Sequence, residues 1–195
     1  MIARTPQNIH NLCIVCDVQP QYETGCTFDM KEFVQYLKTF NFVLYLFNDW
    51  KVNCPDTEES VKNFLKEKGQ ASDEDLKHIR FQPKVFWNFR DVLDLPEVPW
   101  EEAVKLLKMM ILRNVEHANE LCLSDLQACL SDEKVINKLM RGKLQFYYNP
   151  NLANLLTRYS GATNVGGFEN QCNLEINLYL DALGIPYEKN FKYIY

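Results

Sequence analysis

Two apolar runs near the start of the chain constrain its fold more than any other feature. The first run, residues 12–17, ends in an acid, Asp17, and the second, residues 41–48, is followed by another, Asp49. Segments of this length that are apolar without alternation are typical of strands buried on both faces of a parallel sheet. Residues 28–40 lie between the two runs and carry apolar side chains at helical spacing. The pattern therefore predicts strand, helix and strand, the unit from which parallel sheets are built.

The same alternation continues along the rest of the chain. Helices are predicted at 57–68, from Ser72, at 150–159 and from Cys172 to Gly184, strands at 79–86, 144–148, before Gly166 and within 185–195, and a helical stretch over 99–140. Thr57 is expected to cap its helix and Gly69 to close it in the C′ position. We therefore predict an α/β chain with one domain over residues 1–195. Its expected form is a three-layer Rossmann-like fold, with a mostly parallel sheet, helices on both faces and an extra helical segment around 99–140.

Composition and charge narrow the class of function. The chain has 195 residues, of which 47% are hydrophobic, enough for a packed core. The net charge is −5, and acidic and basic residues are interleaved. The sequence therefore shows no cluster of basic residues that could bind a phosphate backbone, and no nucleic-acid partner is expected. No apolar run reaches the roughly 18 residues of a membrane span, and the first residues lack the apolar core of a signal peptide. We expect no membrane association.

The seven cysteines are odd in number. Cys13 and Cys16 have C-x-x-C spacing, but they lie inside a predicted strand, where alternate faces separate them. Reduced thiols in a cytoplasmic protein are the expectation, not disulfides or a zinc site. Cys172 differs from the others because it stands in the first turn of a predicted helix. There the helix dipole favours the thiolate and makes the sulfur a better nucleophile, although a small buried apolar side chain is the alternative interpretation.

Three segments carry most of the remaining chemistry. Asp17-Val-Gln19 ends the first strand, Lys84-Val-Phe-Trp-Asn-Phe89 begins within the third predicted strand, and Gly166-Gly-Phe-Glu-Asn-Gln-Cys172 places a cysteine six residues after a glycine. In this order the segments resemble the motifs of the isochorismatase-like cysteine hydrolases, the family that includes nicotinamidases. The resemblance implies a single domain of that family, acting as a hydrolase on a small amide or related C–N bond.

The resemblance also implies a role for each site residue. Cys172 would be the nucleophile, Asp17 would shuttle the proton, and Lys84 would favour the thiolate electrostatically. In the family, a cis peptide shortly before the cysteine orients backbone donors toward the oxyanion. Carried over, this is the Gly167–Phe168 bond, with the N–H groups of Phe168 and Cys172 forming the oxyanion hole.

Side chains near these motifs could bind a flat substrate. The predicted substrate-binding residues are Gln19, Trp50, Phe86, Trp87 and Phe89. Aromatic rings can stack on a heteroaromatic substrate, although packing in the core is the ordinary role of such side chains. The expected partner is a small-molecule substrate, and the resemblance implies a homo-oligomer, because the family commonly self-associates.

The segment Asp49-Trp50-Lys51 departs from the family. Nicotinamidases carry Asp-Trp-His here, and the Asp and His bind a metal. A lysine ammonium donates hydrogen bonds and cannot ligate a cation. His10, His78 and His117 lie far from this segment in the sequence. We therefore expect no nicotinamidase-type metal site and no cofactor.

Two other functions remain open. A PIN-like nuclease would hold Mg²⁺ with Asp17, Asp49 and a third acid such as Glu175, because carboxylates at strand ends suit that ion. A catalytically inactive α/β module would instead bind a partner. It would have an unreactive Cys172 and an exposed apolar patch, for example along residues 99–117.

Overall fold

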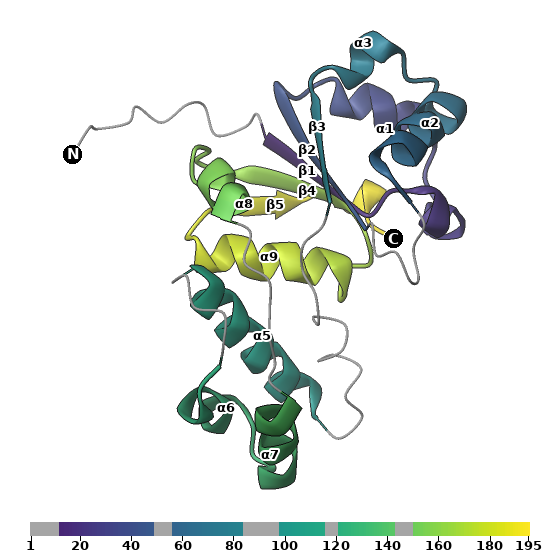
Figure 1. Cartoon of the computed structure of the whole chain (residues 1–195). Helices are drawn as coiled ribbons and strands as arrows, with labels where there is room; N and C mark the ends of the chain where they lie inside the picture. Colours follow the sequence, from purple (N-terminus) through teal and green to yellow (C-terminus); the bar gives the residue numbers. More distant parts are fainter. Residues whose placement is uncertain (1–11, 49–55, 84–97, 116–120, 143–149) are drawn as a thin grey trace, which may run out of the picture. The chain divides into compact units, whose positions relative to one another are not determined.

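The computed structural model describes residues 12–48, 56–83, 98–115, 121–142 and 150–195 (Figure 1). They divide into two compact units. The described residues of unit 1 come from 1–84, 158–174 and 185–195, and those of unit 2 come from 85–157 and 175–184. The helical segment predicted around 99–140 falls within unit 2, and the strand predicted at 144–148 lies outside the described residues.

Unit 1 contains a five-stranded sheet in which every strand pair is parallel. Its strands are β1 (Leu12–Cys16), β2 (Phe42–Phe47), β3 (Ile79–Pro83), β4 (Ala162–Gly166) and β5 (Tyr187–Lys189). The strand order is β3-β2-β1-β4-β5, so β5 is an edge strand as predicted. Strands alternating with helices in this order make a Rossmann-like α/β fold, which confirms the predicted fold class.

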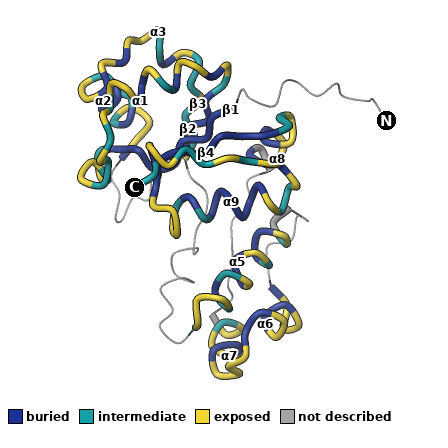
Figure 2. Tube along the Cα trace, turned by 180° about the vertical axis from the view of Figure 1, so that it is seen from behind, coloured by how far each residue is buried: buried dark blue, intermediate teal, exposed yellow. Residues whose placement is uncertain are grey.

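The core of unit 1 lies between the sheet and the two helices α1 (Met30–Leu37) and α2 (Glu58–Gly69). It contains the buried residues Cys13, Val15, Val18, Phe33, Val34, Leu37, Phe40, Val43, Tyr45, Phe47, Val61, Phe64, Leu65, Ala71, Leu76, Val165 and Tyr193. Figure 2 shows β1, β2 and β4 buried. Every residue of β1 is buried, as a continuous apolar strand predicts, and every residue of β4 is buried although Thr163 and Asn164 are polar. Thr57 caps α2 through a capping box with Ser60, which confirms the predicted start of this helix.

Gly69 does not close α2 in the way predicted. It is the last helical residue, and Gln70 after it adopts the left-handed conformation with φ +56°. Packing explains the glycine instead. A Cβ at position 69 would lie 2.4 Å from Val34 Cγ2 and 3.0 Å from the Met30 carbonyl oxygen. The glycine therefore lets α1 and α2 approach closely.

Replacing Gly69 by alanine is expected to lower the free energy of unfolding by about 1–3 kcal/mol, because the added methyl overlaps Val34. Urea denaturation measures this cost. In the background of Val34→Ala, which removes the atom that the methyl meets, the cost of Gly69→Ala should fall below half. An equal cost in both backgrounds would contradict the packing explanation.

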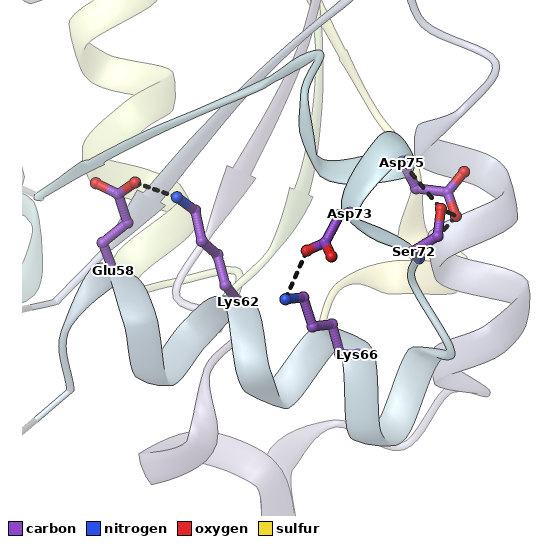
Figure 3. A network of polar contacts seen from close by, with 6 residues as sticks. All are labelled: Glu58, Lys62, Lys66, Ser72, Asp73 and Asp75. Carbon is purple, nitrogen blue, oxygen red and sulfur yellow. Dashed lines mark hydrogen bonds and ion pairs between the residues drawn. The ribbon is translucent and has the colours of Figure 1, made fainter.

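A network of polar contacts covers the outer side of α2 and the short helix α3 (Asp73–Leu76) (Figure 3). Lys62 pairs with Glu58 at 2.5 Å and Lys66 with Asp73 at 2.7 Å. Ser72 and Asp75 form the capping box of α3. Exposed ion pairs of this kind contribute little to stability, so we interpret the network as an ordinary solvent-exposed helix surface.

Unit 2 is helical in its described part. It contains α5 (Trp100–Val115), α6 (Leu123–Cys129), α7 (Glu133–Gly142), α8 (Pro150–Leu156) and most of α9 (Cys172–Ala182). Arg113 on α5 donates to both carboxylate oxygens of Asp125 on α6, at 3.1 and 2.7 Å. This pairing lowers the pKa of the buried Asp125 carboxyl and links the two helices.

Candidate functional site

The loops after β1 and β4 meet at one edge of the sheet. Cys16 at the end of β1 pairs with Gly166 at the end of β4, and the two strands are parallel. Along the sheet, the chain runs from β1 outward to β2 and β3 on one side, while β4 and β5 lie on the other. Ligands of such sheets bind at this reversal of strand order, outside the carboxyl ends of the strands. Asp17 and Gly167, the next residues of the two loops, therefore lie at the expected binding position.

Asp17 adopts a left-handed backbone conformation with φ +53° and is 1% exposed. Its N–H donates to the Leu46 carbonyl at 2.9 Å, and its carbonyl accepts from the Tyr195 hydroxyl at 2.5 Å. Aspartate tolerates this conformation better than most residues, but such backbone strain costs about 1 kcal/mol or more and concentrates at functional sites. The fold holds this carboxylate in a constrained place.

Gln19 closes the loop after β1 onto the end of β2. Its Nε2 donates to the Asn48 carbonyl at 3.0 Å and to Asp56 Oδ2 at 2.9 Å. Its Oε1 accepts from the Asn48 N–H at 2.7 Å, and the side chain is fully buried. These contacts give Gln19 a structural role, because they join the loop after β1 to Asn48 and Asp56. Substrate binding by Gln19 stays a prediction.

The loop after β4 is tight because two glycines in succession have positive φ, +77° at Gly166 and +65° at Gly167. A Cβ at Gly166 would lie 2.3 Å from the Cys16 carbonyl oxygen, and one at Gly167 would lie 2.9 Å from Cys172 Cβ. The turn thus brings the start of α9 directly against the ends of β1 and β4.

The predicted cis peptide between Gly167 and Phe168 is wrong, because the described residues contain no cis peptide bond. The positive φ of Gly167 makes the turn without it. The Phe168 carbonyl then accepts from the N–H groups of Gln171 and Asn173, both at 3.1 Å, as the chain enters α9. The oxyanion role of the Phe168 and Cys172 N–H groups stays a prediction.

Cys172 is the first residue of α9 and is half-buried. Its carbonyl accepts from the Cys16 thiol at 3.4 Å, which places it beside the end of β1. The neighbouring Asn173 is fully buried, and its side-chain amide donates to the Gly166 carbonyl at 2.8 Å. The sequence did not single out Asn173, because an asparagine in a first helical turn is ordinary. It fastens the start of the helix to the end of β4.

Tyr195 is the site residue that the sequence least indicated. Its hydroxyl donates to the Asp17 carbonyl, and its N–H donates to the Gly167 carbonyl at 3.1 Å. Burial above all, and then the charges of Cys26, Asp17, Cys16 and Cys172, raise the pKa of its hydroxyl. Asp17 and Cys172 therefore both lie within electrostatic range of one phenol. The tyrosine was assigned to an edge strand, whereas that strand ends at Lys189 and a 3₁₀ turn, η2 (Phe191–Tyr193), leads to it.

Several predicted site residues lie outside the described residues, namely Asp49, Trp50, Lys84, Phe86, Trp87 and Phe89. Glu175 is buried and belongs to unit 2. Within the described ranges, no three His, Cys, Asp or Glu side chains are grouped so that they could hold a metal ion.

Comparison of the chain with models of protein families, with curated proteins and with solved structures gave no match. No helix in the described part of the chain is both long enough and apolar enough to span a membrane.

Proposed function

We propose that the chain is a cysteine hydrolase that cleaves a small amide or a related C–N bond. Cys172 is the nucleophile and Asp17 the proton shuttle. One observation carries the proposal: a buried, strained aspartate and a half-buried cysteine at a helix start converge at the carboxyl ends of β1 and β4. Tyr195 contacts both loops, because its hydroxyl donates to the Asp17 carbonyl and its N–H donates to the Gly167 carbonyl.

The proposed reaction has two stages. The Cys172 thiol gives its proton to the Asp17 carboxylate, and the sulfur attacks the carbonyl carbon of the substrate. The C–N bond then breaks, and Asp17 returns the proton to the leaving nitrogen, which leaves a thioester on Cys172. Water attacks the thioester carbon, its proton passes through Asp17 to the sulfur, and the acid product departs. The N-terminal end of α9 favours negative charge on the sulfur in both stages.

Lys84 and the aromatic residues of the predicted pocket keep the roles that the resemblance implies. In the sequence, Lys84 directly follows Pro83, the last residue of β3. The proposal assigns it the electrostatic support of the thiolate.

The test is the rate of alkylation of each cysteine as a function of pH, read by peptide mass spectrometry. Cys122 is the internal reference, because it is exposed, is the N-cap residue of α6 in unit 2 and has no part in the proposed chemistry. Burial raises the pKa of the Cys13 thiol and of the Cys129 thiol, and it raises the pKa of Cys26 to about 11, so these three should react slowly. Below neutral pH, Cys172 is expected to react at least about tenfold faster than Cys122, although it is less exposed.

Two variants make the test specific. Lys84→Met should remove the advantage of Cys172 over Cys122, and Cys172→Ser should abolish hydrolysis in a screen of small amides and ureas. A Cys172 that reacts no faster than Cys122 until the protein unfolds would overturn the proposal. An inactive binding module would then fit the chain better, whereas Mg²⁺-dependent RNA cleavage that survives Cys172→Ser would establish the nuclease.

A further inference from the structure

Tyr195 joins the two loops that carry the proposed site. Its hydroxyl donates to the Asp17 carbonyl at 2.5 Å, and its backbone N–H donates to the Gly167 carbonyl at 3.1 Å. One residue thus bonds to the backbone of the loop after β1 and to that of the loop after β4.

The ring of Tyr195 is held as firmly as its polar groups. It meets Phe168 edge-on, with 5.0 Å between ring centroids. A Cβ at Gly25 would lie 2.9 Å from the Tyr195 Cδ2 atom, so the ring packs directly against that glycine. The preceding Tyr193 is buried in the core of unit 1 and anchors the segment. A ring fixed on both sides can hold its hydroxyl in one place.

We propose that Tyr195 is a positioning residue that keeps the Asp17 carboxylate close to the Cys172 thiol. It acts through the backbone of Asp17. The hydrogen bond that its hydroxyl donates restrains the Asp17 carbonyl and so stabilises the left-handed conformation of that residue. Without the hydroxyl, a buried carbonyl loses its donor and the loop relaxes toward the more common negative φ. The carboxylate then moves away from the sulfur. The inference rests on the proposed function, but it can be measured without any substrate.

The expected effect on the alkylation of Cys172 follows from the negative charge of the Asp17 carboxylate. A carboxylate beside a thiol disfavours the thiolate, so it raises the pH at which alkylation of Cys172 is half-maximal. Asp17→Asn should therefore lower this midpoint. Tyr195→Phe should lower it in the same direction by a smaller amount, which at a fixed pH below the midpoint means alkylation about two- to fivefold faster. In the Asp17→Asn background, Tyr195→Phe should add nothing, because the charge that it positions is gone.

The matched control is Tyr22→Phe. Tyr22 also lies in unit 1, and its hydroxyl accepts a hydrogen bond from the Asn48 side chain at 3.2 Å. This variant should leave the alkylation midpoint of Cys172 unchanged. The second test variant is Phe168→Leu, at a position whose ring is 45% exposed and which supports Tyr195 without bonding to Asp17. It should shift the midpoint in the same direction as Tyr195→Phe, by less.

The outcomes separate the inference from the proposed function. A midpoint that Tyr195→Phe leaves unchanged, with a melting temperature lowered as in Tyr22→Phe, would reduce Tyr195 to a structural role and overturn the inference. An equal shift in the Asp17→Asn background would overturn it too, since Tyr195 would then act by another route. The predicted shift and its loss in the double variant would support positioning. It would do so even if no amide is hydrolysed, a result that would count against the proposed function alone.

Discussion

Gly166→Ala is expected to lower the free energy of unfolding by about 3–5 kcal/mol. The added Cβ would lie 2.3 Å from the Cys16 carbonyl oxygen and 2.7 Å from Val18 Cγ2. The oxygen belongs to the backbone of the central strand β1 and cannot move aside. The φ of +77° adds conformational strain for any residue with a side chain. Urea denaturation followed by circular dichroism measures the loss.

Gly184→Ala is the matched control. Gly184 has nearly the same conformation, with φ +66°, but no heavy atom lies within 4 Å of the position its Cβ would take. Its cost should therefore be the conformational part alone, about 1 kcal/mol. Equal costs for the two substitutions would show that Gly166 is required only for its φ. That result would contradict the close contact between Gly166 and the Cys16 carbonyl oxygen.

Gln19→Leu is expected to cost about 3 kcal/mol, because it breaks three hydrogen bonds in a buried place at once. The Asn48 N–H and carbonyl and the Asp56 carboxylate would each lose a partner. Asp56 is only 7% exposed, so part of the cost is that of a buried charge with fewer donors. Denaturation measures the stability. Alkylation of Cys172 shows whether the loop after β1 is displaced.

Gln21→Leu is the control for Gln19→Leu. Gln21 donates to the same Asp56 oxygen, at 3.0 Å, but through its backbone N–H, which leucine retains. Its side chain is exposed, so the substitution should change stability by less than about 0.5 kcal/mol. If Gln19→Leu were equally mild, the buried amide would not be what closes the loop onto β2.

The sequence predicted the order of the elements well because their signals are local. Residues 12–17 and 41–48 became β1 and β2, and the helix predicted at 57–68 became α2, since apolar periodicity and a capping box act within a few residues. Local signals were less reliable for a residue type that can serve two structural purposes, such as a glycine that can end a helix or allow two helices to pack closely. The sequence predicts that Gly69 closes a helix, because glycine is common in that position. The structure shows instead that a side chain at position 69 would overlap Val34 on the neighbouring helix α1.

The candidate site was predictable only in part. The placement of Asp17 and Cys172 at one edge of the sheet was predictable, because one follows a strand and the other starts a helix, and parallel strands bring such positions together. The contacts of Gln19 with Asp56 and of Asn173 with Gly166 were not found. A buried amide can bind a substrate or fasten a loop, and only its actual partners decide which.

The sequence by itself determined the α/β class, the parallel strands and the edge at which Asp17 and Cys172 lie, because burial pattern and strand polarity are properties of short segments. The tertiary structure alone decided what surrounds them. Tyr195 reaches the Asp17 carbonyl across 178 residues of chain, and its hydroxyl is positioned by Phe168 and Gly25. Such a contact exists only after β4 has paired with β1 and β5 with β4, so no local pattern can indicate it.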